Sequence, residues 1–492
     1  MSREIMQAAI DRAAEEINRN RAKVSEAPSR QKYHFMAETG WINDPNGLIY
    51  YKGKYHFFYQ YYPYAGFWDC MHWGHAISDD MLHWEYLPLA LAPSEWYDDH
   101  MKGGCFSGSA IVHDDMLFLM YTGTANNGNG FEQTQCIAYS QDGINFTKYE
   151  GNPVLTAPEG IPTDFFRDPY VWKHNDTYYA VIGANKNNMA QALLYKSPDM
   201  FNWEFVNVLH ESRGEWGFMW ECPTFFELDG KFVLAVSPMG AGERTSVYFV
   251  GDFDYETGKF FPQKTGETDW GFHYYAPTSF CDDKNRRIMV AWANCWDWMP
   301  FWKDWGPTYR EGWCGTFNIP RVATLNEDLS LSFKPIEEIE SIRSGEESLG
   351  AFTVADGETK NLKTGFCYEM KLTVDLKATD ADSFSFLLRQ SGDNKTVITY
   401  DLKNYEIRFD VNNADGWSKG VARGPLNIMG KDELDIDILS DRSSVEIFND
   451  NYTTNLSCNV YTKVNDEVNA ITACGGSVVI KEACSWNLEK TM

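Results

Sequence analysis

The chain has 492 residues, of which 43% are hydrophobic and 15% aromatic, and its formal net charge at pH 7 is −27. A chain of this length exceeds what one hydrophobic core usually supports, so we expect two domains. Nucleic acids and anionic membranes bind basic surfaces, and this acidity argues against both as partners. The surplus of aromatic side chains instead suits an uncharged ligand with flat apolar faces, such as a sugar ring.

Residues 1–30 are predicted to form an amphipathic helix, because apolar side chains recur there at helical spacing. These are Ile5, Met6, Ala9, Ile10, Ala13 and Ile17. Acidic residues interrupt this segment, so it does not resemble a secretory signal, and no other run approaches the length of a membrane span. We therefore expect a cytoplasmic protein with reduced thiols. The helix could pack within one subunit or between two, so the sequence does not decide between a monomer and a homo-oligomer.

Residues 31–335 contain five copies of one unit, a short polar turn followed by an aromatic or aliphatic strand. The copies lie at 50–63, 112–124, 171–184, 225–238 and 280–294. Three of them are followed by a second shared element, a Ser-x-Asp turn and an outer strand, at 78–87, 140–149 and 197–206. Strands repeated at this spacing without intervening helices favour a five-bladed β-propeller. A β-sandwich with similar hairpins is the alternative.

The pattern changes after the repeats. Residues 336–350 read as a linker with a short helix, and residues 351–492 show short alternating strands separated by turns. Such alternation is typical of an antiparallel β-sandwich. The predicted fold is therefore all-β, a five-bladed propeller followed by a C-terminal antiparallel sandwich, with a short N-terminal helix.

Three acids stand at the entrances to repeated strands, each flanked by proline or aromatic residues. They are Asp44 in WINDPNG, Asp168 in FFRDPYVW and Glu221 in FMWECPTFF. Each acid alone is typical of a capped turn before proline. Equivalent blade positions converge on a propeller's axis, however, so three acids in register predict a shared site. Glycoside cleavage needs such a set, one protonated acid and one carboxylate. No motif for a metal, a phosphate or another cofactor accompanies them.

With these motifs the sequence resembles glycoside hydrolase family 32, the β-fructofuranosidases. WINDPNG, FSGSA (106–110), FRDP, ECP and DRSSVEIF all follow the family pattern. The resemblance implies a propeller joined to a C-terminal sandwich. It also implies a retaining hydrolase that cleaves terminal β-D-fructofuranosyl bonds in sucrose, sucrose 6-phosphate or short fructo-oligosaccharides, and that needs no cofactor.

The same resemblance implies roles for individual residues. Asp44 corresponds to the nucleophile, Glu221 to the general acid/base, and Asp168 to the residue that stabilises the transition state. The fructose-binding positions fall at Asn43, Gln60, Trp68, Phe106, Ser107 and Arg167. Trp292 is a further candidate wall of the pocket, with a structural strand residue as the equal alternative. Asp269 matches its motif less cleanly, and candidates to bind a substrate phosphate are Lys303, Arg310 and Arg321.

Three other activities stay open from the sequence. A fructosyltransferase would share every catalytic residue and differ in the acceptor. An arabinanase-type furanosidase also uses three carboxylates on five blades, although the WINDPNG and ECP motifs argue against it. A non-catalytic sugar-binding propeller would be expected to have lost one of the acids, and none is lost.

Overall fold

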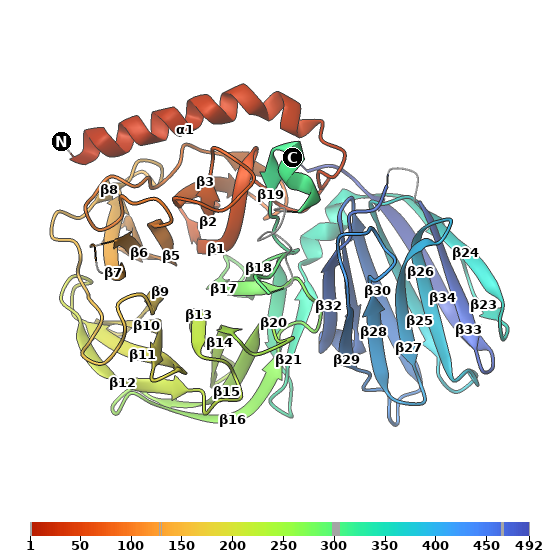
Figure 1. Ribbon diagram of the computed structural model, residues 1–492. Coiled ribbons are helices and arrows are strands. Elements are labelled where there is room, and N and C mark those ends of the chain that lie inside the picture. The colour runs from red at the N-terminus through yellow and green to blue at the C-terminus, as the bar shows by residue number, and fades with distance from the viewer. Residues whose placement is uncertain (1, 127, 129, 298–305, 464–466, 492) are drawn as a thin grey trace.

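The computed structural model describes residues 2–126, 128, 130–297, 306–463 and 467–491. Five small sheets surround a central axis, and two larger sheets stack beside them (Figure 1). This arrangement confirms the predicted all-β fold, a five-bladed propeller followed by an antiparallel sandwich, with a helix at the N-terminus. The first strand of each blade lies nearest the axis, and the last strand lies at the rim.

Helix α1 (Ser2–Ser25) crosses the rim of the propeller (Figure 1). Its apolar stripe is buried in the same core as blade 1, through Met6, Ala9, Ile10, Ala13 and Ile17. The helix therefore packs within its own subunit. Ile5 was placed on this stripe by the sequence pattern, but its side chain is exposed because it lies beside the contact line. Within the described ranges, no helix combines the length and hydropathy needed to cross a bilayer.

The blades follow one another in chain order, each an antiparallel sheet. Blade 1 contains β1 (Gly40–Tyr51), β2 (Lys54–Tyr62), β3 (His72–Ser78), β4 (Trp84–Tyr86) and, added in parallel, β19 (Trp313–Cys314). Blade 2 contains β5 (Gly104–His113), β6 (Met116–Asn126), β7 (Phe131–Ser140) and β8 (Thr147–Lys148). Blade 3 contains β9 (Phe166–His174), β10 (Thr177–Lys186), β11 (Met189–Ser197) and β12 (Glu204–Glu211). Blade 4 contains β13 (Met219–Leu228), β14 (Lys231–Met239), β15 (Val247–Asp254) and β16 (Lys259–Glu267). Blade 5 contains β17 (Tyr275–Cys281), β18 (Arg287–Trp292), β20 (Arg321–Leu325) and β21 (Leu331–Pro335).

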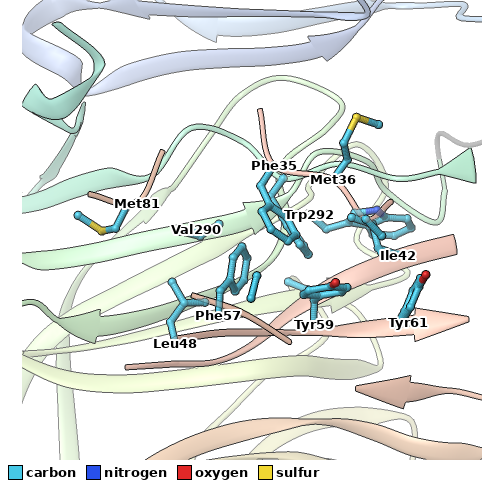
Figure 2. Close-up of a cluster of buried hydrophobic side chains, with 14 of the residues drawn as sticks. Phe35, Met36, Ile42, Leu48, Phe57, Tyr59, Tyr61, Met81, Val290 and Trp292 are labelled. Atoms are coloured by element: carbon cyan, nitrogen blue, oxygen red, sulfur yellow. The ribbon is translucent and has the colours of Figure 1, made fainter. Parts of the chain in front are cut away.

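Segments distant in the sequence close the ring between blades 5 and 1. Strand β19 follows the 3-10 helix η1 (Pro307–Glu311) and pairs with the start of β1. Phe35 then fills the seam, where its ring contacts those of Phe57 and Phe317 at centroid distances of 4.9 and 5.8 Å (Figure 2). Truncation of a buried phenylalanine of this kind costs about 3 to 5 kcal/mol, so the seam contributes substantially to propeller stability.

The sandwich consists of two antiparallel sheets. The first has the strand order β22 (Arg343–Ser348), β34 (Val478–Leu488), β25 (Tyr368–Asp375), β30 (Glu433–Asp441), β31 (Ser444–Asn449) and β32 (Thr454–Asn459), with β23 (Phe352–Val354) also on β34. The second has the order β24 (Thr359–Thr364), β33 (Val468–Cys474), β26 (Ser383–Ser391), β27 (Asn394–Asp401), β28 (Glu406–Asp410) and β29 (Val421–Pro425). The segment 336–350, expected as a linker, contains the 3-10 helix η2 (Glu337–Ile342) and β22.

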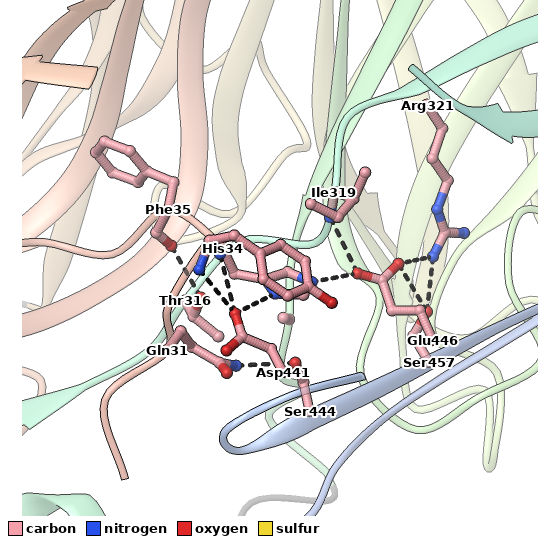
Figure 3. A network of polar contacts seen from close by, with 12 residues as sticks. Gln31, His34, Phe35, Thr316, Ile319, Arg321, Asp441, Ser444, Glu446 and Ser457 are labelled. Atoms are coloured by element: carbon pink, nitrogen blue, oxygen red, sulfur yellow. Dashed lines mark hydrogen bonds and ion pairs between the residues drawn. The ribbon is translucent and has the colours of Figure 1, made fainter. Parts of the chain in front are cut away.

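A buried polar network joins the propeller to the sandwich (Figure 3). Arg321 of β20 donates to Asp269 Oδ2 at 2.8 Å and to Glu446 Oε2 at 2.5 Å, and its side chain is fully buried. His34 lies between Asp441 and Glu446, with ring nitrogens 2.9 and 2.8 Å from their carboxylate oxygens. Burial alone would lower the pKa of His34, but the two carboxylates outweigh burial and raise it to about 9. The imidazole is therefore a cation shared by the two domains at neutral pH.

This network predicts a pH-dependent stability. The pKa of His34 is raised from 6.5 in the unfolded chain to about 9, so its contribution is complete below pH 6.5 and is lost as the pH rises through 9. We expect His34→Gln to lower the free energy of unfolding by about 3 to 5 kcal/mol at pH 6, since it removes the cation beside buried Asp441, whereas Glu446 keeps Arg321. Urea unfolding of both proteins from pH 6 to 9.5 measures the difference, which should shrink toward pH 9. A difference that stays constant with pH would contradict a charged His34.

Candidate active site

The first strands of the five blades each bend at an equivalent position beside the axis. Asp44, Ser107, Asp168, Cys222 and Ala276 occupy these positions in β1, β5, β9, β13 and β17. The ladder register shifts at each of them, the mark of a β-bulge, and Asp168, Cys222 and Ala276 have positive φ angles of 64°, 47° and 52°.

The residue after each of these positions explains the bulge. Proline follows in four blades, and Gly108 follows Ser107 in blade 2. In blades 3, 4 and 5 the proline itself is out of the ladder and so loses no interstrand hydrogen bond, whereas Pro45 in blade 1 stays in register with Tyr59. Asp44, expected in a tight turn, instead lies inside the twelve-residue strand β1. The bulge turns its side chain toward the axis without ending the strand.

These equivalent side chains contact one another across the axis. Ser107 Oγ donates to Asp44 Oδ2 at 2.5 Å. The Cys222 thiol lies 3.5 Å from Asp44 Oδ2 and 3.6 Å from Asp168 Oδ2, and the Cys222 backbone N–H donates to Asp168 Oδ2 at 2.9 Å. Cys222 therefore links the two aspartates. Sequence reasoning noted this cysteine only as a letter of the ECP motif and gave it no role.

Glu221 lies one residue before Cys222, the equivalent position of blade 4. Side chains from two neighbouring blades hold its carboxyl group. Arg167 of β9 donates to Glu221 Oε1 through Nη2 at 2.9 Å and Nε at 3.2 Å. Tyr275 of β17 donates its hydroxyl to Glu221 Oε2 at 2.5 Å. Both carboxylate oxygens are thus oriented by hydrogen bonds from charged or phenolic donors. Tyr275 is a further site residue, to which the sequence motifs assigned no role.

Burial and mutual repulsion raise the pKa values of the aspartates. Burial, followed by the charge of Glu221, raises the pKa of Asp44 to about 6, and the hydrogen bond from Ser107 partly opposes this. Burial also raises the pKa of Asp168 to about 7, although Arg167 lowers it. Burial raises the pKa of Cys222 well above its usual range, so its thiol stays protonated. Burial and repulsion within the cluster therefore bring the pKa values of Asp44 and Asp168 close to neutral pH.

The cluster opens into a cavity of about 450 Å³, within the range of small-molecule sites. All three acids line it, together with Asn43, Gln60, Trp68, Phe106, Ser107 and Arg167, so the structure gathers the three catalytic candidates and every predicted sugar-binding residue except Trp292. The cavity is also lined by Lys102, Thr124, Phe131, Gln133, Asp164, Phe165, Met239, Trp296 and Asp297. These residues lie in loops or on second and third strands, and all except Thr124 fall outside the five repeat copies.

Trp292 does not line the cavity, and its proposed role as a pocket wall is corrected to a structural one. It lies on β18, the second strand of blade 5, and pairs with Tyr275. Its fully buried ring packs 4.9 Å from Trp296 and 5.8 Å from Trp41. Trp292 is therefore one strand removed from the axis and supports Trp296, which does face the cavity.

The remaining candidates lie elsewhere. Asp269 and Arg321 are buried in the network between propeller and sandwich, which rules out direct contact with a substrate phosphate. Arg310 lies exposed in η1 and does not line the cavity. Lys303 lies outside the described residues. Among the described part of the chain, no group of three or more metal-ligating side chains is gathered in one place.

Comparison of the sequence with models of known protein families identifies the family of this chain. The model "Glycosyl hydrolases family 32 N-terminal domain" matches residues 34–335, and the model "Glycosyl hydrolases family 32 C terminal" matches residues 338–487. The chain belongs to glycosyl hydrolase family 32. It is therefore a glycosidase, and its two matched segments correspond to the propeller and the sandwich.

Curated relatives and solved structures agree with the family assignment. A sucrose-6-phosphate hydrolase of Zymomonas mobilis is 35% identical, with 93% of this chain and 92% of the relative covered. A raffinose invertase of Escherichia coli is 34% identical, with 93% and 94% covered. A mutant Bombyx mori GH32 β-fructofuranosidase in complex with sucrose is 32% identical, with a TM-score of 0.83 and coverage of 98% and 99%.

Proposed function

We propose that this family 32 enzyme is a retaining β-fructofuranosidase that hydrolyses the terminal β-D-fructofuranosyl bond of sucrose, sucrose 6-phosphate or short fructo-oligosaccharides. The observation that carries the proposal is the meeting of Asp44, Asp168 and Glu221, from three different blades, at one cavity. The names of the relatives, sucrose-6-phosphate hydrolase and raffinose invertase, support the substrate class.

In the first step, the Asp44 carboxylate attacks the anomeric carbon of the fructosyl unit. The bond from that carbon to the bridging oxygen breaks, and Glu221 gives its proton to this oxygen as glucose leaves. Ser107 and Cys222 hold Asp44 in place through its Oδ2, which reduces the freedom that the reaction would otherwise have to restrict. The product of this step is a fructosyl ester on Asp44.

In the second step, Glu221 accepts a proton from water, and the hydroxide attacks the same anomeric carbon. The ester bond breaks, Asp44 is released as a carboxylate, and two inversions give net retention. Arg167 donates twice to Glu221 Oε1 and so holds this carboxyl group in position for both proton transfers. Asp168, buried beside Arg167, is the proposed acceptor for fructosyl hydroxyls and stabilises positive charge on the ring.

The cavity walls fit a sugar that is bound by few polar contacts and several apolar ones. Trp68 and Phe106 form one aromatic wall, with ring centroids 6.1 Å apart. Asn43 and Gln60 are buried and fixed by hydrogen bonds to Trp41 and to the Cys105 backbone. We propose that these four residues form the fructose subsite together with Ser107 and Arg167.

Lys102 is the cation that the structure offers at the cavity rim besides Arg167, within the described residues that line it. Its ammonium lies 3.1 Å from Asp69 Oδ2. We propose that Lys102 binds the phosphate group of a phosphorylated substrate, since the sequence candidates Arg310 and Arg321 lie elsewhere. The eleven cysteines all lie within the described residues and form no disulfide bond there, which fits the proposed cytoplasmic location.

A pH profile tests the assigned state of Asp44. Because its pKa is raised to about 6, the carboxylate is protonated below that pH, and kcat/KM should fall as the pH drops through 6. Ser107→Ala removes a hydrogen bond that stabilises the ionised form, so the acid limb should move upward by about one pH unit. Initial rates from pH 4 to 8 measure both curves. An acid limb that does not move would contradict the role of Ser107.

Substrate assays decide among the activities. We expect the purified protein to release glucose and fructose from sucrose, and kcat/KM for sucrose and sucrose 6-phosphate ranks the two. Lys102→Ala should lower kcat/KM for the phosphorylated sugar about tenfold or more and leave that for sucrose nearly unchanged. Cleavage of arabinan without cleavage of sucrose would overturn the proposal.

A further inference from the structure

A groove on the C-terminal sandwich lies outside the catalytic cavity. It has a volume of about 330 Å³ and is formed on the outer face of the sheet that contains β34, β25 and β30. We call it the sandwich groove and define it by Lys371, Thr373, Asp435, Asp437, Tyr452 and Trp486. The family motifs and the catalytic mechanism make no use of these residues.

Strand register builds the floor of the groove. Along β25 and β30, alternate residues such as Leu372 and Ile436 point into the sandwich core, and their neighbours point outward. Lys371 pairs directly with Asp437, and Thr373 pairs with Asp435. Two adjacent polar rows therefore cross the sheet on its outer face, and the Thr373 hydroxyl donates to Asp435 Oδ1 at 2.8 Å.

Aromatic rings stand on both sides of this polar floor. Trp486 comes from β34, on one side of β25, and Tyr452 comes from the 3-10 helix η3 (Asp450–Tyr452), beyond β31 on the other side. Both side chains are half-buried. Arg343 lies over the Trp486 ring at 4.5 Å and Lys334 over the Tyr452 ring at 5.6 Å, so each ring is fixed by a cation.

Asp437 gives the floor an unused acceptor. Its residue is only 7% exposed, and its Oδ1 has no hydrogen-bond donor among the described residues. Its Oδ2 lies 3.6 Å from Lys371 Nζ. A buried carboxylate oxygen without a donor is costly. Burial, followed by the neighbouring charge of Glu369, raises the pKa of Asp437 to about 7, although Lys371 and Arg343 lower it. This oxygen is itself buried, so a ligand hydroxyl supplies the donor once the Asp437 side chain turns toward the groove that it lines.

The charges of the groove define the ligand further. Asp435, Asp437 and Glu482 line it together with one cation, Lys371, so an anionic ligand is repelled. Among the described residues, these acids do not form a set that could hold a metal ion. Aromatic sides, hydrogen-bonding side chains on the floor and a small volume together fit a neutral polyhydroxylated ring.

We propose that the sandwich groove is a second, non-catalytic binding site for a neutral saccharide. The apolar faces of the sugar stack against Trp486 and Tyr452, and its hydroxyls bind Asp437, Asp435 and Lys371. The proposal of a binding site depends only on the residues of the sandwich groove. Only the choice of a fructosyl saccharide as its ligand rests on the proposed function.

Fluorine NMR on the full chain tests the groove separately from the catalytic cavity. The protein carries 5-fluorotryptophan and Asp44→Asn to prevent hydrolysis, and the probe is the trisaccharide 1-kestose. Trp486 reports on the groove and Trp68 on the cavity, each assigned by substitution with Phe. We expect both resonances to shift saturably. Asp437→Asn should weaken the Trp486 response about tenfold and leave the Trp68 response unchanged.

The outcomes of this experiment distinguish a failure of the sandwich-groove proposal from a failure of the proposed function. Asp432→Asn, an exposed carboxylate change in the same domain, is the matched control and should alter neither response. If the Trp486 resonance stays fixed while that of Trp68 shifts, the proposed saccharide site in the sandwich groove is wrong. The same conclusion follows if Asp437→Asn leaves the Trp486 response unchanged. A fixed Trp68 with a responsive Trp486 overturns the proposed function and leaves the groove standing. In the active chain, Asp437→Asn should leave kcat for sucrose unchanged.

Discussion

Asp44→Asn is expected to lower kcat for sucrose by about 10⁴-fold or more, the scale on which hydrolases lose activity without their nucleophile. An amide cannot form the fructosyl ester, yet it keeps the shape of the side chain and still accepts the hydrogen bond from Ser107. Binding should therefore be nearly unchanged. Initial rates and the affinity for sucrose, measured by calorimetry on the inactive variant, check both statements.

The matched comparison is Asp168→Asn, the equivalent substitution in blade 3. Asp168 does not bond covalently to the sugar in our mechanism, so we expect a smaller loss, about 10²- to 10³-fold. Mass spectrometry of the wild-type protein denatured during turnover should detect the added mass of a fructosyl unit, and Asp44→Asn should abolish it. A residual kcat within tenfold of wild type in Asp44→Asn would exclude this residue as the nucleophile.

Glu221→Ala is expected to lower kcat for sucrose by about 10²- to 10⁴-fold, because both the proton for the leaving oxygen and the base for water are lost. Glucose is a poor leaving group and needs that proton, whereas p-nitrophenolate does not. Formation of the ester from p-nitrophenyl β-D-fructofuranoside should therefore remain fast. Its hydrolysis should become the slow step.

Azide tests this account of Glu221, since it attacks the ester without needing a base. Added azide should restore turnover of the p-nitrophenyl substrate by Glu221→Ala and give β-D-fructofuranosyl azide. Tyr275→Phe is a suitable control, because it removes the hydroxyl that donates to Glu221 but keeps the carboxyl group, so azide should not accelerate it. Absence of azide rescue in Glu221→Ala, with the variant folded, would contradict the acid/base assignment.

The propeller could be predicted because its signal is local and repeated. Each blade contains a polar turn followed by an aromatic or aliphatic strand, and an Asp-Pro pair precedes that unit in blades 1 and 3, as Glu-Cys-Pro does in blade 4. That regularity is enough to assign Asp44, Asp168 and Glu221 to one axis from the amino-acid sequence alone. The bulge that aims them was not expected, since a proline after an acid is equally typical of a turn.

The errors have a common physical origin, which is that a motif does not tell how far a residue lies from the axis. Trp292 lies inside the fifth repeat copy (280–294), but the strand of that copy is the second strand of its blade, behind Tyr275 of the first. Gln133 and Trp296 reach the cavity from segments without a recurring pattern. Arg321 had the charge to bind phosphate, yet its partners, Asp269 and Glu446, come from segments far apart in the chain. Contacts of this range cannot be read from local spacing.

The most direct test of the central claim is the anomeric configuration of the transfer product. The protein is incubated with sucrose in dilute methanol, and the products are identified by NMR as they form. A double displacement through Asp44 predicts glucose and methyl β-D-fructofuranoside, because methanol intercepts the ester on the face from which water attacks. Methyl α-D-fructofuranoside, or a methyl glucoside, would contradict a retained fructosyl intermediate.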